Sequence, residues 1–320
     1  MKLLVTGASG FVGGAVVRAA RARGWEVRGI GRRALAEDGY AAIDLTRPFD
    51  LDFRPDVVVH AAARSSPWGR EREFTAQNID GTRHVLDFCA THGCPHLVHI
   101  STAAVLYRRE HQLNLDEQTP PPEQPINDYA RTKLAAERLV RGYGGSWAIL
   151  RPRAVFGPGD TVVFPRILRA LERGRLPLIE SDRPVFGDVI FVDTLADYIL
   201  RAAERRATGV YHVTNNEPVE IYAFLRRICE GLNLPPPTRR VSATRALRLA
   251  AFVETIYRCL PFLGEPPVTR FGVSVFAWSK TFDARRTLRD LGPPSVSLEE
   301  GLRRFLAAER ARRSAPLSPP

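Results

Sequence analysis

The first half of the chain alternates short apolar segments with stretches of helical periodicity, and this alternation constrains the fold most. The apolar segments with the length of buried strands are residues 2–6, 26–30, 56–60, 97–101 and 147–150. The helical patterns between them are residues 10–23, 74–90 and 130–141. Strands joined by helices pair in parallel through right-handed crossovers, and the helices then cover both faces of the sheet. The pattern predicts an α/β fold with a doubly wound, Rossmann-type parallel sheet.

A glycine-rich run at the start of the chain indicates what this sheet binds. In LLVTGASGFVG, residues 3–13, Gly7 permits a tight turn, Gly10 leaves room for a pyrophosphate and Gly13 lets the helix pack closely. Phe11 and Val12 begin that helix, whose N-terminus offers unpaired N–H groups to phosphates. Because the run opens a β-α-β unit, it predicts a dinucleotide-binding site.

The residues after the second strand indicate which dinucleotide is bound. An NAD-binding chain places a carboxylate there for the ribose hydroxyls, whereas this chain has Gly31, Arg32 and Arg33. The forked guanidinium of Arg32 suits a 2′-phosphate, so we expect NADP(H) rather than NAD(H). Asp44 and Leu45 follow a third short strand and are expected to border the adenine.

Small residues follow the strand at 56–60. Ala61, Ala62 and Ala63 would let the ribose and pyrophosphate lie against the backbone, although small residues can equally serve tight packing alone.

Tyr129 and Lys133 form a candidate catalytic pair. Their i, i+4 spacing at the start of a helix puts both side chains on one face. A tyrosine that moves a proton to or from a hydroxyl needs a pKa below its usual value of about 10, and a neighbouring ammonium lowers it. Thr102, at the end of a strand, could hold the substrate oxygen beside Tyr129. Lysine otherwise occurs only at Lys2 and Lys280, which suggests that an ammonium is needed at position 133.

With these residues in place, the chain resembles the extended short-chain dehydrogenase/reductases. That superfamily includes nucleotide-sugar epimerases and dehydratases, 3β-hydroxysteroid dehydrogenases and 3-ketoacyl reductases. The matching stretches are TGASGFVGG (6–14), HAAA (60–63), NIDGT (78–82), HISTAAV (99–105), YARTK (129–133), LRPRAVFGPGD (150–160), FVDTLAD (191–197) and GVYHVTN (209–215). The resemblance implies a Thr102, Tyr129 and Lys133 active site, with Pro152 to Val155 near the nicotinamide.

The second half of the chain is less regular. Helical patterns recur at 164–173, 195–204, 221–231 and 298–309. We expect residues 1–165 and 188–215 to form the dinucleotide-binding domain. Residues 166–187 and 216–309 would form a smaller substrate-binding domain, mostly C-terminal. Residues 310–320 lack periodicity and end in serine and proline, so we expect a flexible tail there.

The reaction within the superfamily depends on the substrate side. Nucleotide-sugar enzymes of this group carry an asparagine and an arginine where this chain has Ala154 and Gly187, and Val105-Leu106-Tyr107 replaces the usual V-Y-G. The end of the chain resembles the 3β-hydroxysteroid dehydrogenase and 3-ketoacyl reductase branch, in which steroid dehydrogenation commonly uses NAD. We therefore expect a reductase or dehydrogenase that interconverts a ketone and a secondary alcohol on an apolar, sterol-, acyl- or polyketide-like substrate. The alternatives are a nucleotide-sugar epimerase or dehydratase and a non-catalytic dinucleotide-binding regulator.

Composition narrows the partners. The net charge of +11 comes almost wholly from arginine spread along the chain, and no nucleic-acid-binding module accompanies it, so we expect no nucleic-acid partner. Cysteines and histidines at 89, 92, 94, 96 and 99 suggest zinc, but the helix and strand that carry them would have to bend to converge, so we expect no metal. With no secretory segment and no C-x-x-C pair, we expect a cytoplasmic protein, possible as a homodimer.

The apolar segment at 246–263 is interrupted by charges and by proline, so it is not a bilayer span. Its apolar positions, among them Phe252 and Leu260, form a wide helical stripe. We expect this stripe to be buried; a lid over the substrate or a contact with a membrane surface is the alternative.

Overall fold

The computed structural model describes residues 1–314 and confirms the doubly wound sheet. A seven-stranded parallel sheet has the order β12-β7-β5-β4-β1-β2-β3. Its strands are β1 (Lys2–Thr6), β2 (Glu26–Gly31), β3 (Tyr40–Ala42), β4 (Val57–His60), β5 (His96–Ile100), β7 (Trp147–Pro152) and β12 (Gly209–Val213). Strand order reverses between β1 and β4, and open α/β sheets bind ligands beside such a switch point, outside the carboxyl ends of their strands.

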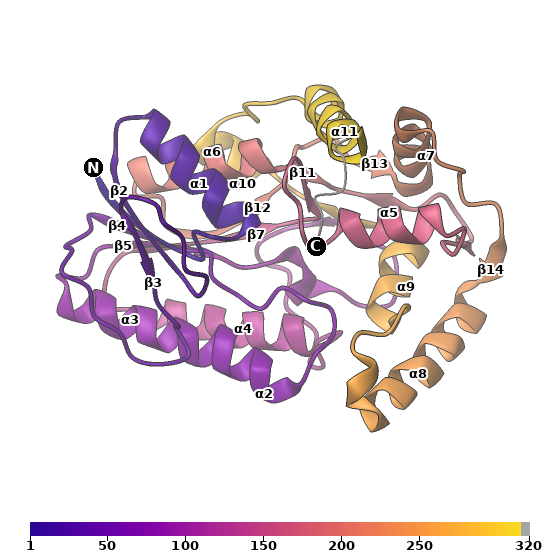
Figure 1. Ribbon diagram of the computed structural model, residues 1–320, viewed down its shortest axis with the longest axis horizontal. Coiled ribbons are helices and arrows are strands. Elements are labelled where there is room, and N and C mark those ends of the chain that lie inside the picture. The colour runs from indigo at the N-terminus through magenta and orange to yellow at the C-terminus, as the bar shows by residue number, and fades with distance from the viewer. Residues whose placement is uncertain (315–320) are drawn as a thin grey trace.

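Helices cover both faces of this sheet (Figure 1). One face carries α1 (Phe11–Ala22), α6 (Val192–Glu204) and α10 (Arg285–Leu291). The other carries α2 (Glu71–Phe74), the π-helix η1 (Thr75–Asp80), α3 (Gly81–Thr91) and α4 (Asp128–Arg141). Because the sheet is covered twice, its central strands are buried along their whole length, which is why they read as unbroken apolar runs.

The remaining elements pack at the carboxyl ends of the strands. A four-stranded sheet contains β13 (Val219–Glu220), β10 (Phe186–Gly187), β15 (Lys280–Phe282) and β6 (Gln112–Leu115). Two-stranded pairs join β8 (Val155–Phe156) to β11 (Ile190–Phe191) and β9 (Leu178–Glu180) to β14 (Arg240–Ser242). The helices are η2 (Ala103–Leu106, 3₁₀), α5 (Phe164–Glu172), α7 (Ile221–Leu232), α8 (Ala243–Cys259), η3 (Pro261–Leu263, 3₁₀), α9 (Arg270–Ala277) and α11 (Leu298–Ser314).

A separate apolar core holds part of this smaller region together. Aromatic rings dominate it, with Phe156 contacting Phe191, Phe224 and Phe305 edge-on at centroid distances of 5.5–6.0 Å. Strand β6 pairs with β15 rather than with the large sheet, although it comes from the first half of the chain. The two halves are therefore interlaced, and the domain boundaries given above remain a proposal.

Three local expectations are corrected. The helix expected at 74–90 begins at Glu71 and is interrupted by the π-helix at 75–80. Helix α11 continues to Ser314, so residues 310–314 are helical because their chain still packs beside α7 and α5; residues 315–320 lie outside the described part of the chain. The apolar stripe of α8 is buried only in part: Ala250 is buried and Leu247, Val253, Ile256 and Tyr257 are half-buried, whereas Phe252 is 64% exposed and Leu260, just after the helix, is 40% exposed.

Candidate active site

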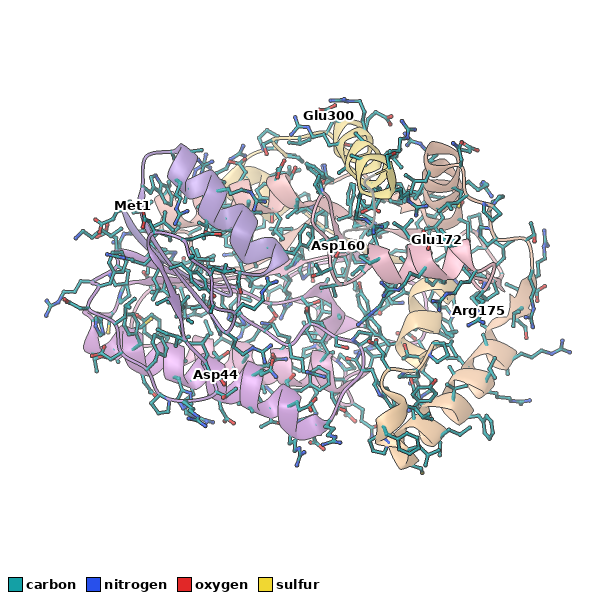
Figure 2. The ribbon with its side chains drawn as sticks, viewed as in Figure 1. Met1, Asp44, Asp160, Glu172, Arg175 and Glu300 are labelled. Atoms are coloured by element: carbon teal, nitrogen blue, oxygen red, sulfur yellow. The ribbon has the colours of Figure 1, made fainter. Side chains whose placement is uncertain are left out.

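A cavity of about 890 Å³ opens at the carboxyl ends of the strands and extends toward the smaller region. In Figure 2, Asp44 lies beside the large sheet and Arg175 beside α5, and both residues line this cavity. Every residue predicted for the cofactor or for catalysis also lines it: Gly7, Gly10, Phe11, Val12, Gly13, Arg32, Asp44, Leu45, Ala61, Ala62, Ala63, Thr102, Tyr129, Lys133, Pro152 and Val155. The fold therefore brings together residues that are far apart in the sequence.

The glycine turn leaves a cradle that side chains would fill. Gly7 has a φ of +69°, and a Cβ there would lie 2.8 Å from the backbone of Ala62. A Cβ at Gly13 would lie 2.2 Å from the carbonyl oxygen of Gly7. The close neighbour of Gly13 is thus the turn itself rather than the sheet. Helix α1 begins at Phe11 behind this turn, and no side chain caps its N-terminus. This cradle fits the pyrophosphate of a dinucleotide.

Two arginines and one aspartate lie at the far end of the same cradle. Arg32 and Arg33 are exposed at the end of β2 and line the cavity. The pKa of Asp44 is lowered, chiefly because the backbone N–H of Thr46 donates to its carboxylate at 3.0 Å, with Arg32 adding a smaller effect. A charged 2′-phosphate or a ribose hydroxyl would therefore find both donors and an acceptor here.

Tyr129 lies in the first turn of α4, which Asn127 caps by accepting a hydrogen bond from Ala130 at 2.8 Å. Thr102 lies in the loop after β5 and is close enough to Tyr129 for its side chain to act on the pKa of that phenol. Burial nevertheless raises the pKa of Tyr129 to about 12, and the hydrogen bond with Thr102 only partly opposes this rise. Lys133 is not among the groups that shift the pKa of Tyr129, so the lowering of this pKa by a neighbouring ammonium stays a prediction.

The amine of Lys133 is hydrogen-bonded to groups of β5. Its Nζ donates to the carbonyl oxygen of Ile100 at 2.6 Å and lies 3.2 Å from Nε2 of His99. The side chain is 1% exposed, and this burial lowers the pKa of Lys133 to about 7. Lys133 thus holds a proton only weakly at neutral pH and does not supply a full charge beside Tyr129.

Buried polar groups fix the position of Lys133. The ring of His60 lies beside that of His99 in a tilted arrangement, with 5.1 Å between the ring centres, and His60 contacts the hydroxyls of Thr6 at 2.7 Å and Thr82 at 2.9 Å. Burial lowers the pKa of His60 to about 3 and that of His99 well below its usual value, so both imidazoles are neutral. A neutral His99 can accept a hydrogen bond from the Lys133 amine.

A second network ties α4 to the sheet, and the sequence reasoning missed it. Glu137 is 1% exposed and accepts two hydrogen bonds from Arg151, at 2.9 and 2.6 Å, and one from Ser101, at 2.5 Å. Glu137 lies four residues after Lys133, on the same helix face, which is the signal that could have found it. Asn78 on the π-helix likewise donates to Thr132 at 3.0 Å. These contacts hold the helix that carries Tyr129.

Neither a metal cluster nor a membrane span is found in residues 1–314. No group of three or more histidine, cysteine or acidic side chains is arranged to hold a metal ion within that range, the candidates at 89–99 included. No helix of the same residues is long and apolar enough to cross a bilayer.

A parallel sheet of this order, with a glycine turn and a Tyr129/Lys133 helix around one cavity, defines a dinucleotide-dependent oxidoreductase. The chain belongs to the NAD dependent epimerase/dehydratase family, whose model matches residues 3–215. The resemblance to the extended short-chain dehydrogenase/reductases is thereby confirmed.

Relatives place the chain within this family. It is 32% identical to a 2-alkyl-3-oxoalkanoate reductase of Stenotrophomonas maltophilia, over 97% of this chain and 100% of the relative. It is 30% identical to a 4-hydroxy-2-methyl-3-oxo-4-farnesyl-3,4-dihydroquinoline-1-oxide ketoreductase of Stigmatella aurantiaca, over 94% and 95% of the two chains. The structure of a UDP-glucuronic acid 4-epimerase from Bacillus cereus in complex with NAD has a TM-score of 0.73 at 20% identity, over 97% and 99%, and shares the fold.

Proposed function

We propose that this protein is an NADP(H)-dependent oxidoreductase that interconverts a ketone and a secondary alcohol on an apolar substrate. The observation that carries the proposal is that one continuous cavity joins the glycine cradle to Tyr129 and then continues between apolar side chains. Those apolar lining residues include Val163, Ile167, Ile179, Ala246, Leu249, Phe271, Val273 and Phe276. A pocket of this kind suits an acyl, polyketide or sterol skeleton.

The cofactor, when bound, supplies or accepts the hydride, and the residues of this chain transfer the proton and hold the substrate oxygen in place. Tyr129 gives a proton to the substrate oxygen, or takes one from it, while Thr102 holds that oxygen in place. Lys133 has a pKa of about 7, so it can exchange a proton near neutral pH and restore the protonation state of Tyr129. The names of the two relatives given above describe a reductase of oxoalkanoates and a ketoreductase of a farnesyl compound, which supports the same chemistry here.

Epimerase or dehydratase chemistry is the less favoured alternative. A nucleotide-sugar substrate brings a diphosphate, and positions 154 and 187 offer it only Ala154 and Gly187. The shared fold with a sugar-nucleotide epimerase does not bear on the substrate at 20% identity.

Replacing Tyr129 by phenylalanine tests the proposal. A panel of sterols, 3-oxoacyl compounds and nucleotide sugars is followed by NADPH absorbance, and the best substrate is then used with the variant. Tyr129→Phe should lower kcat by about 100-fold or more while leaving NADPH affinity unchanged. Tyr143→Phe is the matched control, because Tyr143 is not among the residues that line the cavity and its hydroxyl donates to the carbonyl of Pro95. Equal turnover in all three proteins would refute the assigned role.

The preference for NADP(H) rests on Arg32. Its exposed guanidinium borders the cradle where a carboxylate would select NAD. Arg32→Ser should weaken NADPH binding by about 10-fold or more and leave NADH binding nearly unchanged. Stronger binding of NADH than of NADPH by the unaltered protein would contradict this preference.

The apolar face at the α8–η3 corner supports a peripheral contact with a membrane surface, in a cytoplasmic setting. Leu249, Phe252, Phe262 and Leu263 are 43–81% exposed there. Arg248 and Arg258 are exposed on the same helix, and cations beside apolar side chains favour an anionic bilayer surface. A homodimer that buries the same face is the rival arrangement, and sedimentation of the protein without lipid separates the two.

A further inference from the structure

His99 is a fully buried histidine on β5 that contacts the lysine of the candidate catalytic pair. Lys133 lines the cavity, whereas His99 is not among the lining residues. Nε2 of His99 lies 3.2 Å from Nζ of Lys133. The other ring nitrogen, Nδ1, is buried and has no hydrogen-bond partner in residues 1–314. Lys133 therefore connects the cavity to a histidine ring that has one unpaired nitrogen.

The neighbouring His60 is held in a single tautomer. The hydroxyl of Thr82 donates to the carbonyl oxygen of Asn78 at 2.6 Å, so toward Nε2 of His60, at 2.9 Å, it can only accept. The hydroxyl of Thr6 accepts from the N–H of Ala62 at 3.1 Å and has its own proton for Nδ1 of His60, at 2.7 Å. Both nitrogens of the neutral ring are satisfied when the proton is on Nε2.

His99 has no such constraint. A neutral imidazole carries one proton, which can be on either nitrogen. With the proton on Nδ1, Nε2 of His99 accepts a hydrogen bond from the ammonium of Lys133. With the proton on Nε2, the ring donates to the lone pair of the neutral amine. Because no partner holds Nδ1, the ring can change tautomer without breaking another hydrogen bond, and Nζ can donate to the carbonyl oxygen of Ile100 in both cases.

The groups around this pair let the lysine change its charge and keep the histidine neutral. Burial lowers the pKa of Lys133 to about 7, and the charge of Glu137 on the same helix opposes this lowering. The carboxylate of Glu137 is itself bound by Arg151. Burial, then the charge of Lys133, then His60 on β4 hold the pKa of His99 well below its usual value. The pair therefore carries at most one positive charge, and that charge is on the lysine.

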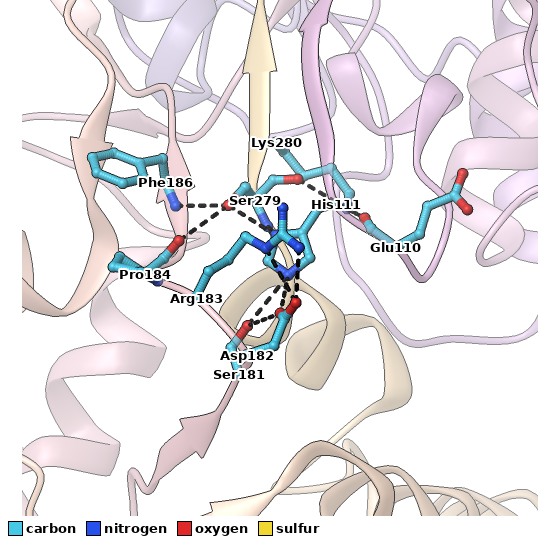
Figure 3. Close-up of polar contacts among 9 residues, drawn as sticks. All are labelled: Glu110, His111, Ser181, Asp182, Arg183, Pro184, Phe186, Ser279 and Lys280. Atoms are coloured by element: carbon cyan, nitrogen blue, oxygen red, sulfur yellow. Dashed lines mark hydrogen bonds and ion pairs between the residues drawn. The ribbon is translucent and has the colours of Figure 1, made fainter.

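The second buried lysine has a different environment. Burial also lowers the pKa of Lys280 to about 7, but its Nζ donates to the carbonyl oxygens of Glu110 at 2.5 Å and Ser279 at 3.3 Å (Figure 3). The nearby His111 contacts Ser279 and Asp182 instead, as the dashed lines in Figure 3 show. Carbonyl oxygens only accept, so they cannot donate to the lone pair of a neutral amine. His99 can do so for Lys133.

We propose that His99 is a positioning residue that changes tautomer as Lys133 gains or loses its proton, so that Nζ stays hydrogen-bonded in one place in both states. This rests on the proposed function, in which Lys133 restores the protonation state of Tyr129. The pair loses one proton in all: Nε2 gains the proton that makes it a donor, Nδ1 loses its proton, and the lysine becomes neutral. The amine thus keeps its place while its charge changes.

Nitrogen-15 NMR of the cofactor-free, full-length protein with labelled histidines tests the tautomer. The nitrogen shift distinguishes a protonated ring nitrogen from a bare one, and the signals of His99 are those lost in His99→Gln. The proton should be on Nδ1 at about pH 6 and on Nε2 at about pH 8.5, on either side of the pKa of Lys133. A single tautomer over this range, or uptake of a second proton by the ring, would overturn the proposal.

Two lysine variants are the controls for this measurement. Lys133→Met removes the titrating partner, so His99 should then keep one tautomer at every pH. Lys280→Met makes the same substitution at the other buried lysine and should leave the change at His99 intact. A change of tautomer that survives in Lys133→Met would belong to Glu137 or His60 and would overturn the proposal.

The pH profile of kcat/KM tests the effect on the reaction, with NADPH and the best substrate of the panel. The wild type should show an apparent pKa near 7. His99→Phe removes an acceptor from the charged lysine, so this apparent pKa should fall by about one unit, because hydrogen bonds to charged groups are the stronger ones. His99→Gln should restore most of it, since an amide can accept or donate. His111→Phe is the matched control and should leave it unchanged; an unmoved value in His99→Phe would contradict the proposal.

The two measurements separate this inference from the proposed function, because the NMR experiment needs no turnover. A change of tautomer at His99 in a protein that reduces no substrate of the panel would refute the proposed function alone. Turnover by a protein whose His99 keeps one tautomer would refute the role of His99 alone.

Discussion

Gly13 and Gly14 are neighbours in the first turn of α1 and give a matched test of the glycine cradle. A Cβ at position 13 would lie 2.2 Å from the oxygen and 2.6 Å from the carbon of the Gly7 carbonyl. A Cβ at position 14 would lie 3.3 Å from the carbonyl oxygen of Ala8. Gly13→Ala thus collides with backbone that cannot rotate away, whereas Gly14→Ala makes only a tight contact.

The two variants should differ in stability and, more strongly, in cofactor binding. Alanine gains about 1 kcal/mol over glycine within a helix, and overpacking costs about 1–3 kcal/mol. Gly14→Ala should therefore change the free energy of unfolding by less than about 1 kcal/mol, and Gly13→Ala should lower it by up to about 2 kcal/mol. Relief of the collision moves the turn, and two lost N–H···phosphate bonds at about 1.5 kcal/mol each weaken NADPH binding by about 100-fold.

Urea denaturation gives the first quantity, and titration of NADPH fluorescence gives the second. The comparison is made on folded protein, as judged by circular dichroism. NADPH affinity within a factor of about 2 in both variants would refute the assignment of the glycine turn as the phosphate cradle. An equal loss in both would show that the helix terminus matters but that the approach of residue 13 to Gly7 does not.

Three further predictions follow from the buried and exposed groups. Glu137→Gln leaves the guanidinium of Arg151 without its buried counter-charge, so the free energy of unfolding measured in urea should fall by about 3–5 kcal/mol. Glu137→Leu combined with Arg151→Met removes both charges and should recover much of this loss. Equal losses in the single and double variants would contradict the prediction. Burial lowers the pKa of Lys133 from 10.5 to about 7, so between these pH values the unfolded chain binds more protons than the folded one and the free energy of unfolding should rise with pH. Lys133→Met should reduce this slope, with Lys280, whose pKa is also lowered to about 7, supplying the rest. An unchanged slope would show that burial does not lower the pKa of Lys133. Phe252→Ser with Phe262→Ser should reduce co-sedimentation with vesicles of anionic phospholipid, while the control Leu113→Ser, on exposed β6, should not, and a monomer that never binds vesicles would refute the membrane contact.

Most of the large sheet was predicted from the sequence, because each of its buried strands and covering helices produces a recognisable local pattern of apolar residues. Strands β1, β2, β4, β5 and β7 were all expected within a residue or two of their observed bounds. The π-helix was not expected, because its six residues form little more than one turn, which is too short for a change in the apolar period to be recognised; Asn78 within it donates to Thr132. The exposed side of α8 was missed for a related reason, since an apolar stripe does not reveal whether anything packs against it.

The sequence by itself determined the dinucleotide fold and the glycine turn and singled out Thr102, Tyr129 and Lys133 as candidates, because each signal is a short local pattern at the end of a strand or within one helix or turn. Only the tertiary structure decided the charge states and the directions of these side chains. Lys133 is turned toward Ile100 and His99, and Nε and Nη2 of Arg153 are buried without a hydrogen-bond partner among residues 1–314, because segments far apart in the chain remove water from both side chains. Desolvation depends on what surrounds a group in space, and no local spacing records it.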